Sequence, residues 1–224
     1  MIFNKIKFDV EKILYYLIFA YAFFIPISRA GIGVFSVLLI LIWLFKPTFK
    51  EDIKYLKSNK FVIVFVFFIL YSFVGSLWSD DILYAMNYVK KYWYYLPIFV
   101  IATTLKREQI SYVFSAFLLG MLISEVISYG IFFEWWQWKN CIPLNPTPFM
   151  NHIQYSYFLV FAAFVLLYEA LSHEEGKKRF IYGLFFITMT SNIFINAGRI
   201  SYITFIVGLV LFFFLKVKSK LIWA

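Results

Sequence analysis

Residues 61–77 read FVIVFVFFILYSFVGSL, an apolar run without a charged side chain. A bilayer-crossing α-helix needs roughly 17–25 predominantly apolar residues, so this run is long enough to span a membrane. A membrane β-strand needs only about 9–11 residues, and its polar and apolar side chains alternate. The run does not alternate in this way. It therefore predicts a transmembrane helix.

The same pattern recurs along the chain. Of the 224 residues, 63% are hydrophobic, 24% aromatic and only 15% charged, and the mean hydropathy is +0.80. A soluble domain is about 45–50% apolar and about 25% charged. We therefore expect an all-α integral membrane protein, with residues 1–224 forming a single transmembrane domain. This domain would be a polytopic bundle of about eight helices, at residues 13–27, 31–45, 61–77, 92–105, 110–133, 153–171, 180–195 and 200–215.

The positions of the basic residues predict the orientation of these helices. If the N-terminus is cytoplasmic, all of the 21 Lys and Arg residues lie on the cytoplasmic side except Arg29, Lys90, Lys91, Lys139 and Arg199. Cytoplasmic loops of membrane proteins carry such an excess of basic residues. The net charge of +9 then suits contact with anionic lipid headgroups of the bilayer, and it does not indicate nucleic-acid binding. We expect a multi-pass protein of the bacterial inner membrane.

Arg199 is the first candidate for substrate binding. It lies in Asn196-Ala197-Gly198-Arg199-Ile200-Ser201, at the external start of the last predicted helix. The N-terminus of a helix attracts anions, and an arginine fork adds two hydrogen bonds to a phosphate group. Gly198 would let the backbone come close to such a ligand. The alternative is an arginine that only reaches toward the membrane interface.

Three more cations are expected on the external side. Lys90 and Lys91 precede the fourth predicted helix, and Arg29 lies in the first external turn. These residues depart from the positive-inside pattern, and a phosphate-bearing substrate would explain them. For the two lysines, pairing with Asp80 and Asp81 is the alternative.

His152 is a weak candidate for a catalytic residue. It follows Pro146-Thr147-Pro148-Phe149-Met150-Asn151, and an imidazole can exchange a proton near neutral pH. The alternative is a histidine that bonds only to backbone or water. Glu125 lies inside the fifth predicted helix, where a carboxylate must be protonated, paired or exposed to a wet cavity.

Cofactors and metals are not expected. Cys141 is the only cysteine, and the two histidines, His152 and His173, would lie on opposite sides of the membrane. A zinc site is therefore not expected. The sequence also has no glycine-rich phosphate loop.

Three stretches together resemble the O-antigen ligase and O-antigen polymerase family of membrane proteins. They are Trp78-Ser79-Asp80-Asp81 running through Ala85 to Lys90-Lys91-Tyr92, Pro148 to Ser156, and Asn196 to Ser201. The order of helices and the loop lengths are also similar across nearly all of the chain. The resemblance is to the N-terminal two-thirds of such proteins.

The resemblance implies a glycosyltransferase of lipopolysaccharide or surface-glycan biosynthesis, active on the periplasmic face. Its donor would be a glycan on undecaprenyl pyrophosphate, and its acceptor would be lipid A–core or the growing glycan. No metal would be needed, because arginines hold the pyrophosphate. Arg199 matches the family arginine, while Lys90 and Lys91 fall in a region that assists it.

The sequence departs from the family at its C-terminal end. Family members continue into a large periplasmic loop with a further essential histidine and arginine, and then more helices. This sequence stops at Trp223-Ala224, so we expect a truncated form, whose activity alone is in question. There are two alternatives. One is a membrane transporter or channel, which Glu125 inside a predicted transmembrane helix favours, and the other is a non-catalytic membrane subunit.

Overall fold

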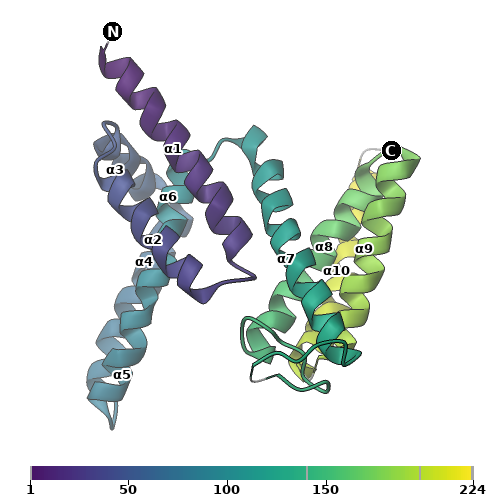
Figure 1. The fold of residues 1–224 in the computed structure, drawn as a ribbon. Coiled ribbons are helices and arrows are strands. Elements are labelled where there is room, and N and C mark those ends of the chain that lie inside the picture. Colours follow the sequence, from purple (N-terminus) through teal and green to yellow (C-terminus); the bar gives the residue numbers. More distant parts are fainter. Residues whose placement is uncertain (1, 140, 197, 223–224) are drawn as a thin grey trace. The chain divides into compact units, whose positions relative to one another are not determined.

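The computed structural model describes residues 2–139, 141–196 and 198–222, and it is helical throughout apart from loops. An isolated bridge between Ile142 and Asn145 is the one β-type pairing in this described part. The predicted all-α class is thereby confirmed. The elements, labelled in Figure 1, are α1 (Ile2–Phe24), α2 (Arg29–Leu44), α3 (Phe49–Ser58), α4 (Lys60–Gly75), η1 (Ser76–Trp78), α5 (Ile82–Val89), η2 (Lys90–Tyr95), α6 (Pro97–Thr104), η3 (Arg107–Gln109), α7 (Ile110–Phe132), α8 (His152–Ser172), α9 (Gly176–Ile195) and α10 (Arg199–Ile222).

Four helical stretches among the described residues are long and apolar enough to cross a membrane. They are Lys60–Trp78, Arg107–Phe132, His152–Ser172 and Arg199–Lys216. The pair Arg29–Leu44 and Phe49–Ser58 passes the same test only when both helices are taken together, and they are bent by 105°. The membrane-type helices expected from the sequence are therefore present, while eight complete spans remain a prediction.

The outer surfaces of these helices are apolar. Only 11% of Lys60–Trp78 is buried inside the protein. On α4 the side chains of Phe61, Val64 and Phe67 are each about two-thirds or more exposed, at 71%, 68% and 67%. Apolar surface of this extent is stable only when lipid or another protein covers it. This surface makes the chain a membrane-associated protein.

The segment predicted as the fourth transmembrane helix, residues 92–105, differs from a single helix. The 3-10 helix η2 ends at Tyr95, and the short helix α6 begins at Pro97. Proline favours the first position of a helix, because its missing N–H has no intrahelical partner there. The preceding external loop is also partly helical, because Asp81 accepts a 2.9 Å hydrogen bond from the Tyr84 N–H and so caps α5.

The segment predicted as a cytoplasmic loop, residues 46–60, contains α3 and a buried corner. Asp52 Oδ2 accepts hydrogen bonds from Trp43 Nε1 and Lys46 Nζ, each 2.9 Å long. All three residues are buried, and the Trp43 ring meets the Phe49 ring at 4.8 Å. Lys46, expected among the solvated anchoring lysines, is instead half of a buried ion pair. Sequence reasoning missed this pair because charge patterning does not show which charges pack inside a bend.

Substitution of Asp52 by alanine should destabilise this corner. The buried Lys46 ammonium would lose its counter-ion, which costs about 3–5 kcal/mol in buried pairs. The measurement is the thermal unfolding midpoint of the purified chain in detergent, followed by tryptophan fluorescence. Glu51→Ala, an exposed neighbour on the same helix, is the control and should change stability by about 0.5 kcal/mol or less. Equal midpoints for the two variants would contradict the structural role of the pair.

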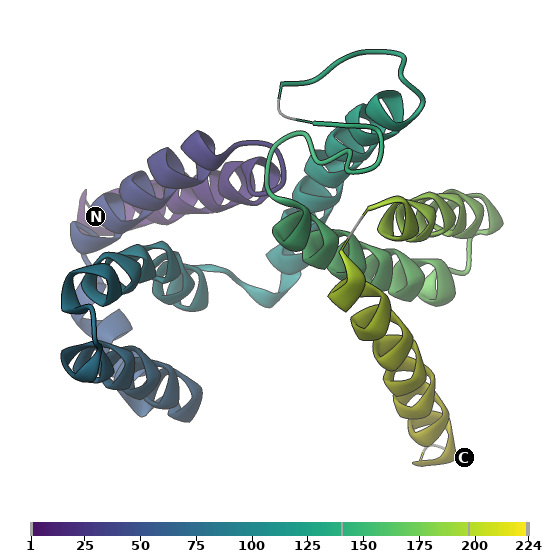
Figure 2. The same ribbon diagram turned by 90° about the horizontal axis from the view of Figure 1, so that it is seen from below.

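The chain divides into two compact units. One contains α1 as far as Ala22 together with Ala30–Val113, and the other contains Phe23–Arg29 and the chain from Phe114 onward. The second unit carries the candidate site, so its packing matters most. In it, α8 and α9 form an antiparallel hairpin and lie side by side, and α10 packs on α8 (Figure 2).

Glycines permit the close helix contacts of the second unit. A Cβ atom on Gly120 of α7 would overlap the Phe23 carbonyl oxygen and lie 2.7 Å from the Pro26 ring. A Cβ atom on Gly208 of α10 would lie 2.5 Å from the Phe164 ring of α8. Small residues let helices approach in this way inside membranes, where association depends on packing.

Candidate functional site

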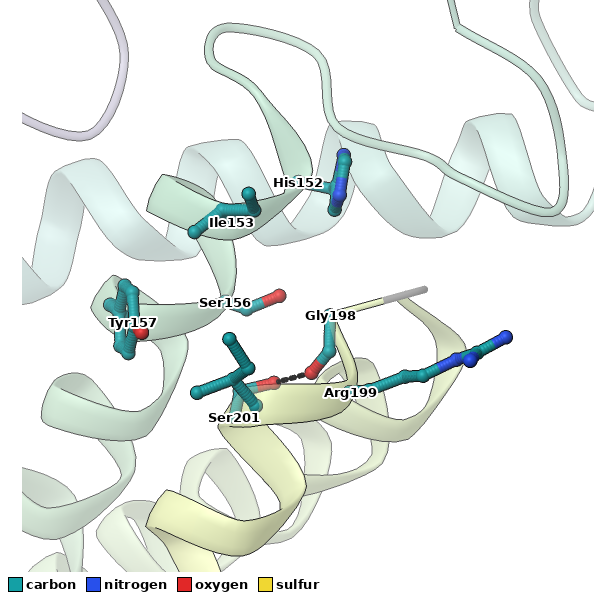
Figure 3. A pocket seen from close by; sticks show the side chains of 8 residues that line it. His152, Ile153, Ser156, Tyr157, Gly198, Arg199 and Ser201 are labelled. Atoms are coloured by element: carbon teal, nitrogen blue, oxygen red, sulfur yellow. Dashed lines mark hydrogen bonds between the residues drawn. The ribbon is translucent and has the colours of Figure 1, made fainter.

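A pocket of about 280 Å³ lies between the N-terminal ends of α8 and α10 (Figure 3). It joins two residues that the sequence singled out separately, His152 and Arg199. These residues are 47 positions apart in the chain, and the antiparallel order of α8, α9 and α10 returns them to one end of the unit. The lining residues are His152, Ile153, Ser156, Tyr157, Gly198, Arg199, Ile200 and Ser201.

The floor of the pocket is a close contact between Gly198 and Ser156. A Cβ atom at position 198 would overlap the Ser156 hydroxyl, so only glycine fits here. The sequence suggested that Gly198 would admit a ligand to the backbone; the structure shows that it admits a serine of α8. Ser156 is 1% exposed, and its Oγ has no hydrogen-bond partner among the described residues. Buried hydroxyls are usually paired, so this oxygen is available to a ligand in the pocket.

The start of α10 is held by its own hydrogen bonds. The Ser201 N–H donates to the Gly198 carbonyl at 2.9 Å, and the Ser201 hydroxyl donates to the same oxygen. The Tyr202 hydroxyl donates to the Asn196 carbonyl at 2.6 Å. These bonds fix the turn on which Arg199 stands. Ala197, which belongs to the same sequence motif, lies outside the described residues.

The start of α8 is fixed from the loop that precedes it. Asn151 caps the helix, because its Oδ1 accepts a 2.8 Å hydrogen bond from the Gln154 N–H. Upstream, Trp138 Nε1 donates to the Pro148 carbonyl at 2.9 Å, and its ring meets Phe149 edge-on. Trp138 therefore holds the proline-containing loop in place just before His152.

The pocket is electrostatically positive. It lies at two helix N-termini, each of which carries a partial positive charge, and Arg199 is one of its lining residues. Figure 3 shows this side chain extending outward from Ser156 and Gly198, with the His152 ring on the opposite helix. Arg199 is exposed and His152 is half-buried, so both polar groups can reach a ligand at the mouth. Such a site favours an anion, and a phosphate group fits an arginine fork best.

The other predicted substrate-binding residues do not line this pocket. Arg29 is the exposed first residue of α2. Lys90 and Lys91 belong to the first unit, where Lys90 Nζ donates to Asn87 Oδ1 at 3.3 Å and Lys91 Nζ lies 5.3 Å from the Tyr88 ring centre. The alternative that these lysines pair with Asp80 or Asp81 is not what the structure shows, because nearby neutral side chains are their partners.

Sequence reasoning missed Ser156 and Ser201. Serine is common in membrane helices, and its position relative to a second helix becomes visible only after folding. A signal was nevertheless present, because Ser156 is one helical turn after His152 and therefore on the same face. Among the described residues, no three His, Cys, Asp or Glu side chains gather as a metal site would require.

Comparison of the chain with protein-family models, with curated proteins and with solved structures found no match.

Replacing Gly198 by alanine should separate α8 from α10 and lower the thermal midpoint of the purified chain by several degrees. The new methyl group would collide with the Ser156 side chain, and overpacking typically costs about 1–3 kcal/mol. Gly183→Ala is the matched control, because nothing lies within 4 Å of a Cβ atom there. A second change, Ser156→Gly, should restore the midpoint of the Gly198→Ala variant. Failure of this rescue would show that the contact does not set the helix spacing.

Proposed function

We propose that the chain is a membrane-embedded glycosyltransferase, or the part of one that binds the donor. Its donor is a glycan carried on undecaprenyl pyrophosphate, and its acceptor is lipid A–core or the growing glycan, at the periplasmic face of the bacterial inner membrane. The observation that carries the proposal is the pocket that Arg199, His152 and Ser156 line together, with the Ser156 hydroxyl buried and unpaired among the described residues. The resemblance of the three sequence motifs to the O-antigen ligase and polymerase family adds to it.

The size of the pocket suits the charged head of this donor. Small-molecule sites usually measure about 300–1,000 Å³, and 280 Å³ accommodates the phosphates while the sugars and polyprenyl chain stay outside. In glycosyl transfer, negative charge grows on the departing pyrophosphate. Arg199 and the helix N-termini would stabilise that charge. His152, within the same pocket, would take the proton from the acceptor hydroxyl as a general base.

Arg199→Ala should weaken binding of a polyprenyl pyrophosphate by roughly 10–100-fold, since a hydrogen bond to a charged group contributes about 1.5–3 kcal/mol. Binding of the corresponding polyprenol should not change. The measurement is the Kd of the purified chain in detergent for each lipid. Arg199→Lys should be intermediate, because lysine keeps the charge and loses the fork.

Arg179→Ala is the control for this experiment, because Arg179 is exposed and lies near the opposite end of α9. It should bind both lipids like the unsubstituted chain. A pyrophosphate lipid that binds no more tightly than the polyprenol would overturn the proposed site.

In cells that lack the chain, loss of the surface-glycan ladder, with polymer left on the lipid carrier, would support a ligase; a single-repeat band would support a polymerase.

A transporter is the second candidate function, favoured by the burial of Glu125 in α7, which is 2% exposed. Solute flux into proteoliposomes that depends on Glu125 would support it over the transferase. A non-catalytic membrane subunit would bind the pyrophosphate lipid without transferring glycan.

Cys141 provides a test of the proposed orientation. A membrane-impermeant maleimide added to intact spheroplasts should label this single cysteine, because its loop is proposed to face the periplasm. Burial raises the pKa of the Cys141 thiol, so labelling should speed up as the pH is raised toward that pKa. Lys178→Cys in a Cys141→Ser background should react only after permeabilisation. Labelling of position 178 in intact spheroplasts would reverse the proposed topology.

A further inference from the structure

A buried polar cluster lies in the interior of the second unit. It is formed by Ser124, Glu125 and Ser128 of α7, Tyr155 of α8, and Asn192 of α9. Glu125 is 2% exposed and the other four residues are fully buried, at 0%. Tyr155 lies in the first turn of α8 and is adjacent in the chain to the pocket residue Ser156.

Hydrogen bonds tie the cluster to the end of α9. The Ser128 hydroxyl donates to Asn192 Oδ1 at 3.2 Å, which links α7 to α9. Asn196 Nδ2 donates to Asn192 Oδ1 at 2.7 Å and to the Asn192 carbonyl at 2.9 Å. The side chain of Asn192 is therefore fixed as an acceptor, and its Nδ2 group has no hydrogen-bond partner in the described part of the chain.

Other polar atoms around Glu125 also lack partners. Among the described residues, Glu125 Oε1, Ser124 Oγ and the Tyr155 hydroxyl are buried and make no hydrogen bond of normal length and angle. Tyr155 lies next to Ser124 and Glu125, and Thr188 of α9 lies next to Glu125. These oxygens therefore come from three helices and surround one carboxyl group. Unpaired buried polar atoms are rare in folded proteins and each needs an explanation.

The charge of Glu125 has no counterpart in the described part of the chain, where it forms no ion pair. The titratable groups that face it are both tyrosines: Tyr129 on α7, whose hydroxyl donates to the Thr188 carbonyl at 2.8 Å, and Tyr155 on α8. From α9 it meets the neutral Thr188. An ionisable residue at membrane depth is a functional site by default, and a carboxylate there needs a compensating positive charge.

We propose that Glu125 binds a monovalent cation, a proton or Na⁺, at the centre of this cluster. Neutralisation of the carboxylate is common to both ions. Hydroxyl and carboxyl oxygens are the ligands that hard cations prefer, and Ser124 and Tyr155 supply them beside Glu125. The proposal does not depend on what the pocket binds.

The first experiment measures the infrared carboxylic-acid band of the full chain in lipid nanodiscs, at neutral pH in Na⁺-free K⁺ buffer. A band that disappears in Glu125→Gln, persists in Glu134→Gln and is unchanged by added Na⁺ identifies the bound cation as a proton. Glu134 is the matched control because it is an exposed glutamate beyond the end of α7.

The second measurement is the thermal midpoint of the same samples with Na⁺ or K⁺ at equal ionic strength. If the cation is Na⁺, saturating Na⁺ should raise the midpoint by roughly 5 °C or more at about a hundred times the Kd. K⁺ should have no such effect, and Glu125→Gln should abolish the Na⁺ response. Absence of both the acid band and the Na⁺ response would overturn the proposal.

A milder variant keeps the test informative if Glu125→Gln fails to fold. Tyr155→Phe removes one hydroxyl from the cluster and retains the ring. It should shift the frequency of the Glu125 acid band if a proton is bound, or reduce the Na⁺-induced rise if Na⁺ is bound. A Tyr155→Phe chain with an unchanged band and an unchanged Na⁺ response would overturn the assignment of Tyr155 to the site.

Discussion

The need to pair backbone N–H and C=O groups in an apolar medium is the constraint on which this structure depends. Where side chains are nearly all apolar and lipid surrounds them, an α-helix satisfies every interior backbone group within its own segment. The helical stretches Lys60–Trp78 and Arg199–Lys216 show this most clearly, because little of their surface is buried inside the protein. At Pro97, which lacks an N–H, the helix α6 begins just after the 3-10 helix η2.

Glycines, which have no side chain beyond a hydrogen atom, allow the helices to pack closely. In a bilayer, apolar surface gains nothing by moving from lipid to protein, so close contact and buried polar bonds must hold helices together. Gly120, Gly198 and Gly208 each provide such a contact in the second unit. The Gly198 contact has an additional effect, because it determines where the start of α10 meets the start of α8. The pocket is therefore a product of helix packing.

The second unit contains two sets of polar groups, one around Arg199 and the other around Glu125. They differ in the sign of their charge and in how deeply they are buried in the protein. Arg199 and His152 lie at the helix ends, where water and a charged headgroup can reach them. Glu125 lies inside α7, where it is fully surrounded by protein. Tyr155 and Ser156 connect the two sets along α8. A chain that separates a positive pocket from a buried carboxyl in this way can bind an anion at the surface and a cation beneath it without direct neutralisation of one site by the other.

The sequence by itself determined the membrane character, the helical class and the approximate positions of the apolar helices, because composition and run length act locally along the chain. It also singled out Arg199, His152 and Glu125, since charged or titratable groups stand out against an apolar background. Tertiary structure alone decided that Arg199 and His152 share a pocket, that Ser156 lies in its floor and that Lys46 pairs with Asp52 in a buried corner. These relations depend on contacts between helices, and no local pattern specifies which turn of one helix faces which turn of another.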